Sequence, residues 1–219
     1  MNIRSVFTYV VVLMLGFIIR PSQAMENYQQ QIRQLHQSWA EVTFQLQGQA
    51  QKDGFEQLRQ VTGQLLQNNN DKAEVWLMSG LINASYSQVA GGLQLLKLAK
   101  AARHDLEKAI QIDDQAMHGM AYYCLANLYH QVPAWPFSFG SDKTAKRLFD
   151  KALQNNANDA AAHYYYAQFL YDNELFEQAR LHFMLSKVHS ADSIKIAEQS
   201  RLQLANQQLA KLDKDHAQK

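Results

Sequence analysis

The sequence contains little of several residue types, and each scarcity narrows the fold or the function. It has one cysteine, three prolines and nine glycines among 219 residues. A single cysteine excludes an intramolecular disulfide and any cysteine-rich zinc or iron–sulfur site. Charged residues make up 19% of the chain, and the formal net charge is +1. Because nucleic-acid-binding proteins usually carry a strong basic excess, this balance argues against a nucleic-acid partner.

The residues that are abundant favour helices. The chain has 27 glutamines and is rich in alanine and leucine. After residue 24 it has no long run of β-branched residues, and its two remaining prolines, Pro133 and Pro136, share one segment. This composition predicts an all-α protein, and the length predicts a single domain with a sizeable core.

The first 24 residues have the anatomy of a secretory signal peptide. Arg4 gives a positive start, residues 6–19 form an apolar run, and the small residues Ser22 and Ala24 precede an expected cleavage after Ala24. The run is shorter than the ~20 residues that a membrane-spanning helix needs. We therefore predict an exported, periplasmic domain over residues 25–219 with no membrane span. The alternative is an uncleaved N-terminal anchor.

The remaining chain repeats a pattern of two helices. In residues 160–193, apolar and small side chains recur at helical spacing twice, on either side of a turn at Asn173 and Glu174. Similar copies occupy residues 119–159 and 73–118, and a weaker copy occupies residues 39–72. The residues that recur at equivalent places are Trp76, Gly80, Ala102, Leu106 and Ala109; Leu125, Ala126, Tyr129, Ala145, Phe149 and Ala152; and Tyr166, Ala167, Leu170, Ala179, Phe183 and Ser186.

In these positions the chain resembles the tetratricopeptide-repeat (TPR) family. The resemblance implies a short right-handed solenoid of helical hairpins with capping helices, which we expect at residues 27–51 and 192–214. Each helical hairpin would leave one apolar face for its neighbour to cover. The alternative is an ordinary helical bundle with alanine-rich contacts.

Two copies are longer than the usual repeat. Residues 85–93 extend one hairpin without a helix breaker other than Gly91 and Gly92, which predicts two lengthened helices. Residues 131–141 form a loop with Trp135, Phe137 and Phe139, because two prolines exclude a helix. Three aromatic side chains would either pack onto the repeats as a plug or line a binding pocket.

The loop adds to the resemblance. A Val-Pro-x-Trp-Pro-x-x-Phe-Gly-x-Asp segment before a Lys-Thr-Ala helix looks like a group of exported bacterial TPR proteins. It is more remotely similar to the T component of TRAP-type solute transporters, although this chain lacks the cysteine that carries a lipid in many of those proteins.

A search for chemistry in the sequence finds no strong catalytic or metal-binding motif. The eight histidines are scattered, and His182 and His189, two turns apart on one predicted helix, are too far apart to share an ion unaided. Cys124 lies among core positions with no basic neighbour, which predicts an inert thiol. We therefore expect no enzymatic activity, no cofactor and no metal.

The first helix of each repeat supplies the candidate binding face. In TPR proteins this face is concave, and here it would carry an aromatic, amide-rich and almost uncharged set of side chains. They are Tyr123, Asn127, His130, Tyr164, Gln168 and Tyr171. Such a set suits an extended peptide, so the resemblance implies a scaffold or adaptor for a protein partner. One alternative is an auxiliary transporter subunit that binds an apolar solute and a substrate-binding subunit. Another is that the C-terminal helix fills the groove.

Overall fold

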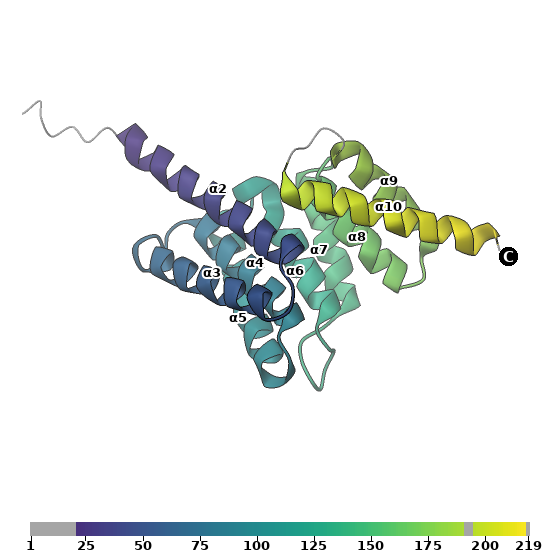
Figure 1. The fold of residues 1–219 in the computed structure, drawn as a ribbon, viewed down its shortest axis with the longest axis horizontal. Helices are drawn as coiled ribbons and strands as arrows, with labels where there is room; N and C mark the ends of the chain where they lie inside the picture. Colours follow the sequence, from purple (N-terminus) through teal and green to yellow (C-terminus); the bar gives the residue numbers. More distant parts are fainter. Residues whose placement is uncertain (1–20, 191–194, 218–219) are drawn as a thin grey trace, which may run out of the picture. The chain divides into compact units, whose positions relative to one another are not determined.

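The structure is a computed structural model that describes residues 21–190 and 195–217, and it confirms the all-α class. In these ranges the helices are α2 (Pro21–Gln45), α3 (Gly48–Asn68), α4 (Ala73–Val89), α5 (Gly92–Ile112), α6 (Met120–Gln131), α7 (Asp142–Asn155), α8 (Ala160–Asp172), α9 (Phe176–Ser190) and α10 (Ile196–Ala217), with a short 3-10 helix at Ala116–Gly119 (Figure 1). Among the described helices, none combines the length and apolarity needed to cross a membrane.

The expected signal peptide falls largely outside the described residues. Its last four residues begin α2, which starts at Pro21. Proline suits the first helical position, where its missing N–H would have no partner in any case. The chain divides into two units, Met1–Gln34 and Leu35–Lys219. The first contains the N-terminal part of α2, and every contact described below lies within the second.

The expected capping helix at residues 27–51 is wrong at its C-terminal end. Helix α2 stops at Gln45, and α3 begins at Gly48, whose φ of +61° is in the left-handed region that favours glycine. The side-chain amide of Gln51 donates to the carbonyl oxygens of Val42 and Thr43, both at 3.1 Å. These bonds satisfy carbonyl groups near the end of α2 that have no partner within the helix.

Three helical hairpins follow the predicted repeat boundaries. Helices α4 and α5, α6 and α7, and α8 and α9 pack as consecutive pairs. The breaks between and within pairs have local causes, such as the positive φ of Gly92, the Ser141 cap on the Thr144 N–H at 3.2 Å and the Asp159 cap on the Ala162 N–H at 2.8 Å. The insertion at residues 85–93 lengthens its hairpin as predicted, because α4 has 17 residues and α5 has 21.

The positions that were predicted to recur in each repeat are the positions that are buried in the core. The second-helix positions are at most 3% exposed in all three hairpins, namely Ala102, Leu106 and Ala109; Ala145, Phe149 and Ala152; and Ala179, Phe183 and Ser186. On the first helices, Gly80, Ala126 and Ala167 are also buried, and the Cβ position of Gly80 lies directly against the Leu106 side chain. These contacts assign the hairpins to a helical-repeat architecture.

A buried polar network joins α3, α4 and α5. The carboxylate of Asp105 accepts hydrogen bonds from the Ser79 hydroxyl at 2.8 Å and from the Asn83 amide at 3.1 Å. The Asn83 side-chain oxygen in turn accepts from Nε of Arg59 at 2.8 Å. Because Ser79, Asn83 and Asp105 are all buried, the bonds satisfy groups that water cannot reach.

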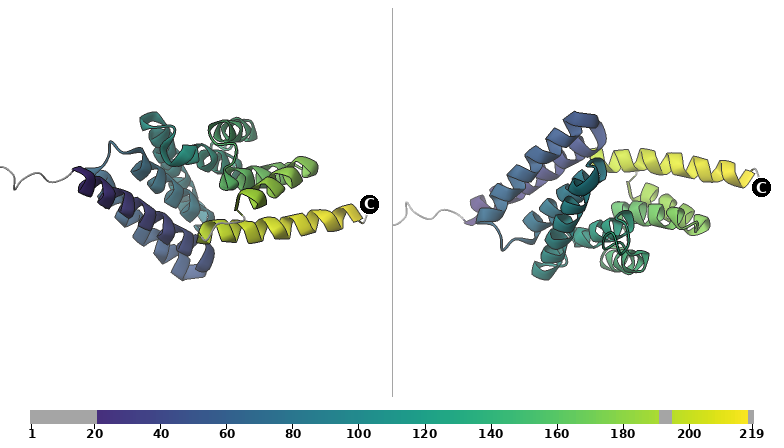
Figure 2. Two further views of the ribbon diagram at one scale, coloured as in Figure 1. Left: turned by 90° about the horizontal axis from the view of Figure 1, so that it is seen from above. Right: turned by 90° about the horizontal axis from the view of Figure 1, so that it is seen from below.

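Helix α10 packs along α8 and α9, and the two further views place it beside this pair (Figure 2). Its buried side chains are Ala197, Arg201, Ala205 and Leu212, spaced by four, four and seven residues along one face of the helix. Among the leucines of α10, Leu204 is exposed, and Leu202 and Leu209 are only half-buried. Alanines allow α10 to approach the tyrosine-rich helix α8 closely, which the larger leucines would not.

Candidate functional site

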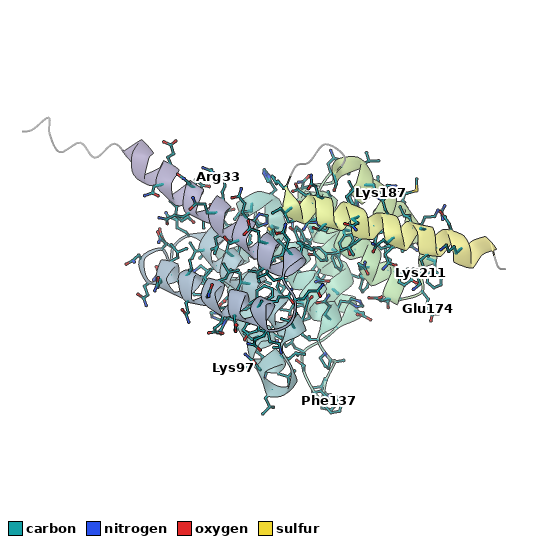
Figure 3. All side chains as sticks on the ribbon, viewed as in Figure 1. Arg33, Lys97, Phe137, Glu174, Lys187 and Lys211 are labelled. Atoms are coloured by element: carbon teal, nitrogen blue, oxygen red, sulfur yellow. The ribbon has the colours of Figure 1, made fainter. Side chains whose placement is uncertain are left out.

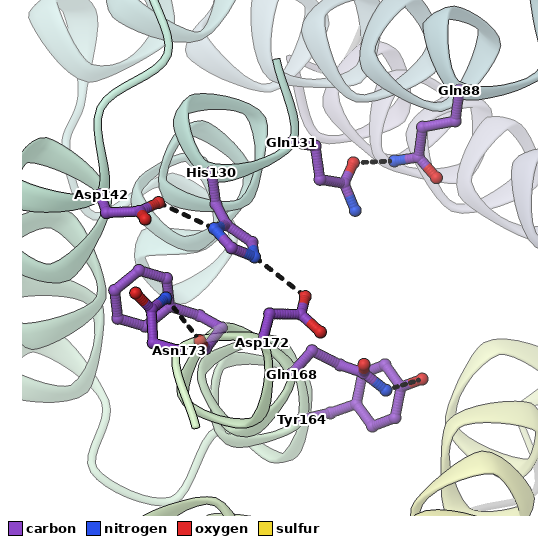
Figure 4. Close-up of polar contacts among 9 residues, drawn as sticks. Gln88, His130, Gln131, Asp142, Tyr164, Gln168, Asp172 and Asn173 are labelled. Atoms are coloured by element: carbon purple, nitrogen blue, oxygen red, sulfur yellow. Dashed lines mark hydrogen bonds and ion pairs between the residues drawn. The ribbon is translucent and has the colours of Figure 1, made fainter. Parts of the chain in front are cut away.

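The six residues predicted to line a groove come from two adjacent helices. Helix α6 supplies Tyr123, Asn127 and His130, and the residues from α8 are Tyr164, Gln168 and Tyr171. Tyr123 and Tyr164 are buried, and the other four are half-buried. The Gln168 amide donates to the Tyr164 hydroxyl at 3.0 Å (Figure 4). The structure therefore brings the six residues to one region, but it does not leave them open.

Helix α10 is what covers this region. Arg201 is buried close enough to Tyr123, Cys124 and Tyr165 for its charge to act on their pKa values, and Lys211 lies 5.0 Å from the centre of the Tyr171 ring. The expectation of an open groove is therefore wrong for Tyr123 and Tyr164. The structure shows the other arrangement that the sequence allowed, in which the C-terminal helix occupies the face.

The contact of α10 with this face combines apolar side chains with polar groups. In the described part of the chain, Nε of Arg201 and Oε1 of Gln208 are buried without a hydrogen-bond partner within the protein.

A small cavity lies beneath these helices. It is lined by ten residues, among them Trp39 of α2, Ser85 of α4, Asn127 of α6 and Tyr165 of α8. The Trp39 indole N–H donates to the Ser85 hydroxyl at 2.8 Å across it. Its volume is about 30 Å³. That is enough for one or two water molecules, whereas pockets for drug-sized ligands begin near ~300 Å³.

The side chains around this cavity are not activated for chemistry. Burial is the main cause that raises the pKa of Tyr123, Tyr165 and Cys124 above their ordinary values. A buried thiol held in its protonated form is not a nucleophile at neutral pH. Cys124 is therefore a core residue, as its sequence neighbours indicated.

His130 lies at the edge of the same face and bridges two carboxylates. Its Nδ1 is 2.9 Å from Asp142 at the start of α7, and its Nε2 is 3.0 Å from Asp172 at the end of α8 (Figure 4). Burial opposes protonation of His130, but hydrogen bonds and charge from the two carboxylates outweigh it and raise its pKa. The predicted binding residue thus acts as an ionic link between three helices.

The aromatic loop at residues 131–141 presents two of its three rings to solvent. Trp135 is 86% exposed and Phe137 is 78% exposed, and Phe137 projects from the loop at a distance from the helices (Figure 3). Phe139 instead packs against the Tyr129 ring, with centroids 5.3 Å apart, and under the Arg103 guanidinium at 4.4 Å. Only Phe139 is the plug that we expected, and neither Trp135 nor Phe137 is folded back onto the repeats.

The loop carrying these rings is held by hydrogen bonds. Gly140 N–H donates to the Pro133 carbonyl and Ser141 N–H to the Tyr129 carbonyl, both at 2.9 Å. A Cβ at Gly140 would collide with the Val132 carbonyl oxygen, so only glycine fits this crossing. The Gln88 amide donates to Gln131 at 2.6 Å and links the loop's base to the long hairpin.

Sequence reasoning missed one cluster. His163 of α8 meets His182 of α9, with the two Nδ1 atoms 2.8 Å apart, and the His189 ring stacks on His163 at 5.8 Å. The sequence indicated only that His182 and His189 are too far apart along α9 to share an ion. Helical spacing could not reveal the contact of His182 with His163, because His163 comes from another helix. Across residues 21–190 and 195–217, no group of three or more His, Cys, Asp or Glu side chains has metal-binding geometry.

Comparison of the sequence with known protein families and with characterised proteins finds no match. The function is therefore argued from the fold and from the features above.

Proposed function

We propose that this chain is a non-enzymatic TPR-like scaffold or adaptor, exported to the periplasm, that holds a partner protein or peptide. The observation that carries the proposal is the pair of exposed aromatic side chains, Trp135 and Phe137, on a loop with internal hydrogen bonds. TPR-like membership is supported by the equivalent buried positions of three consecutive hairpins.

A third large apolar side chain is exposed on the long hairpin. Leu93, at the turn of the long hairpin, is 87% exposed. The Gln88–Gln131 hydrogen bond and the Arg103–Phe139 contact tie that hairpin to the loop. Large aromatic side chains exposed on one loop, such as Trp135 and Phe137, are typical of surfaces that bind another molecule.

The energetics favour a macromolecular partner at this place. Full burial of a Trp or Phe side chain contributes ~1.5–3 kcal/mol, and aromatic residues are enriched among the few that dominate protein interfaces. Because the loop is already ordered by its backbone bonds and by Phe139, little entropy is lost when Trp135 and Phe137 are covered. A near-neutral chain also lacks the basic excess that draws proteins to anionic lipid.

The face formed by the first helices of the repeats, here called the helix-A face, is a second surface of the same scaffold, and α10 already covers part of it. Tyr123 and Tyr164 are buried, and Arg201 of α10 lies close enough to both for its charge to act on their pKa values. A partner that binds these two rings must therefore first displace Arg201. Partner binding at the aromatic loop needs no such step, so we place the primary contact there.

The auxiliary-subunit alternative requires room for an apolar solute. The cavity on the helix-A face, about 30 Å³, is roughly a tenth of the smallest usual ligand pocket. No observation favours this second function over the scaffold.

The test is photo-cross-linking in the living cell. Benzoyl-phenylalanine in place of Phe137 changes the ring little and should cross-link to one polypeptide, whereas the same probe at Val188 should not. Val188 is a suitable control because it is also exposed, at 68%, but lies on α9. A probe at residue 137 that captures only lipid, or nothing, contradicts the proposal.

Once a partner is captured, the contribution of the loop can be measured. Trp135→Ala with Phe137→Ala should weaken binding roughly tenfold or more. Because both rings are exposed, the unfolding midpoint should not change. Binding that survives the double substitution would place the interface elsewhere.

Export is tested separately by the intact mass of the protein recovered from the periplasm. A mass that begins at Met25 supports cleavage after Ala24. A mass that retains residue 1 supports the uncleaved anchor.

A further inference from the structure

The paired histidines of the last hairpin have a geometry that the proposed function does not use. His163 lies on α8 and His182 on α9, and their Nδ1 atoms are 2.8 Å apart. At this distance one proton lies between two nitrogen lone pairs. The pair is part-buried, and His163 is only 4% exposed.

The orientation of His163 is fixed by its other ring nitrogen. Nε2 lies 3.0 Å from the carbonyl oxygen of Ala157, in the turn between α7 and α8. A carbonyl oxygen only accepts, so Nε2 carries the proton of the neutral ring and Nδ1 keeps its lone pair. Metal-binding histidines are typically held in this way, with the second nitrogen bonded to a carbonyl or carboxylate.

His182 can supply a second lone pair at the same point. In the structure its Nδ1 must donate to His163, since His163 Nδ1 has no proton to give. A shift of the His182 proton from Nδ1 to Nε2, the other neutral tautomer, leaves both Nδ1 lone pairs directed at one position. His182 is half-buried and its ring contacts Tyr166, with centroids 4.7 Å apart, so it has more freedom to adjust than His163.

The separation of the two nitrogens is close to what an ion requires. Two imidazole nitrogens at ~2.0–2.1 Å from one tetrahedral ion are roughly 3.3 Å apart. The observed 2.8 Å would have to widen by about half an ångström, which a small rotation of the His182 ring achieves.

The charges around the pair suit a cation. The charge of Asp150 of α7 acts on His182, and the charge of Asp159 at the start of α8 acts on His163.

We propose that His163 and His182 form a two-imidazole site for a divalent transition-metal ion, with water completing the coordination. Two protein ligands leave several positions for water, so the ion would exchange with solvent. Imidazole nitrogen suits Cu²⁺, Ni²⁺ and Zn²⁺, and the usual order of stability places Cu²⁺ first. The His189 ring lies nearly parallel to the His163 ring, with the centroids 5.8 Å apart.

The test is calorimetric titration of the purified protein with CuCl₂ and with ZnCl₂. We expect one equivalent of each ion to bind saturably, with Cu²⁺ the tighter. His163→Gln and His182→Gln should each weaken binding roughly tenfold or more. The matched control is His118→Asn, because His118 is exposed on the 3-10 helix and asparagine tolerates its φ of +63°.

A second measurement keeps the proposal open to refutation if the buried His163→Gln variant fails to fold. Long-range ¹H–¹⁵N spectra of the unmodified protein should show the His182 proton at Nδ1 without metal and at Nε2 with one equivalent of Zn²⁺. No saturable binding, binding that His182→Gln leaves intact, or a His182 tautomer that Zn²⁺ does not change would each overturn the site.

Discussion

His130 and Asp172 are separated by 42 residues, yet Nε2 of the histidine lies 3.0 Å from the aspartate carboxylate. With Asp142 on its other side at 2.9 Å, His130 joins the end of α6 to the start of α7 and the end of α8. The neighbouring hairpins are therefore linked by charge at this edge as well as by their apolar core.

The link predicts a pH dependence of stability. Burial disfavours the protonated ring, but the two carboxylates outweigh it and raise the pKa of His130 above the ordinary 6.5. The stabilisation is therefore complete below about pH 6.5 and is lost as the pH rises through the folded-state pKa. Urea unfolding should show that the free energy of unfolding falls by about 0.5 kcal/mol between pH 6 and pH 9. The effect is small because the carboxylates are half exposed, and it should be absent from His130→Gln. Parallel curves for the two proteins would refute the link.

The lowered pKa of His36 predicts the opposite pH dependence of stability at acid pH. Burial first, then the charges of Arg201 and Lys195, lower its pKa to about 4, although Glu198 opposes them. Between pH 6.5 and 4 the unfolded chain therefore binds a proton that the folded chain does not, and the free energy of unfolding falls as pH falls. His36→Gln should make this decline shallower by about 1–3 kcal/mol at pH 4. An unchanged slope would show that His36 is protonated in the folded protein.

The close packing at Gly80 predicts that a larger side chain there would destabilise the hairpin of α4 and α5. A Cβ there would lie 2.6 Å from Cγ of Leu106 and 3.1 Å from the Leu106 backbone nitrogen. Gly80→Ala should therefore destabilise the protein by about 1–3 kcal/mol, despite the better helix propensity of alanine. Gly63→Ala is the control, because nothing lies within 4 Å of its Cβ position. Gly63→Ala should be as stable as the unmodified protein or up to about 1 kcal/mol more stable. Thermal melting of both variants measures the difference between them.

The buried network predicts a second large effect. Asp105→Ala leaves the Ser79 hydroxyl and the Asn83 amide without their shared acceptor. The loss should be about 2–4 kcal/mol, because both groups stay buried. Asp53→Ala removes an exposed carboxylate, bonded to Gln49 on the surface of α3, and should cost less than about 0.5 kcal/mol. Equal denaturation midpoints for the two variants would mean that water reaches the network.

The repeat register could be read from the sequence because it depends on local spacing. Ala145, Phe149 and Ala152 share one face of α7 whatever lies opposite, and the same holds for the equivalent residues of α5 and α9. The long hairpin and the proline loop could also be predicted, since glycine and proline act on the backbone at their own positions.

The candidate site could be predicted only as a set of residues on one face. Tyr123 and Tyr164 were placed correctly on adjacent helices, but Arg201 of α10, which is far away in the sequence, also lies close to both. A helix packed on tyrosines needs small residues, and nothing within α10 reveals what it will meet.

The sequence by itself determined the all-α class, the hairpin boundaries and the buried register, because each follows from propensity and spacing within a few turns of helix. Only the tertiary structure decided that α10 covers the helix-A face, that Trp135 and Phe137 stay exposed while Phe139 is packed, and that His163 meets His182. Those outcomes depend on which side chains two distant segments bring together, and that is a property of the packed chain.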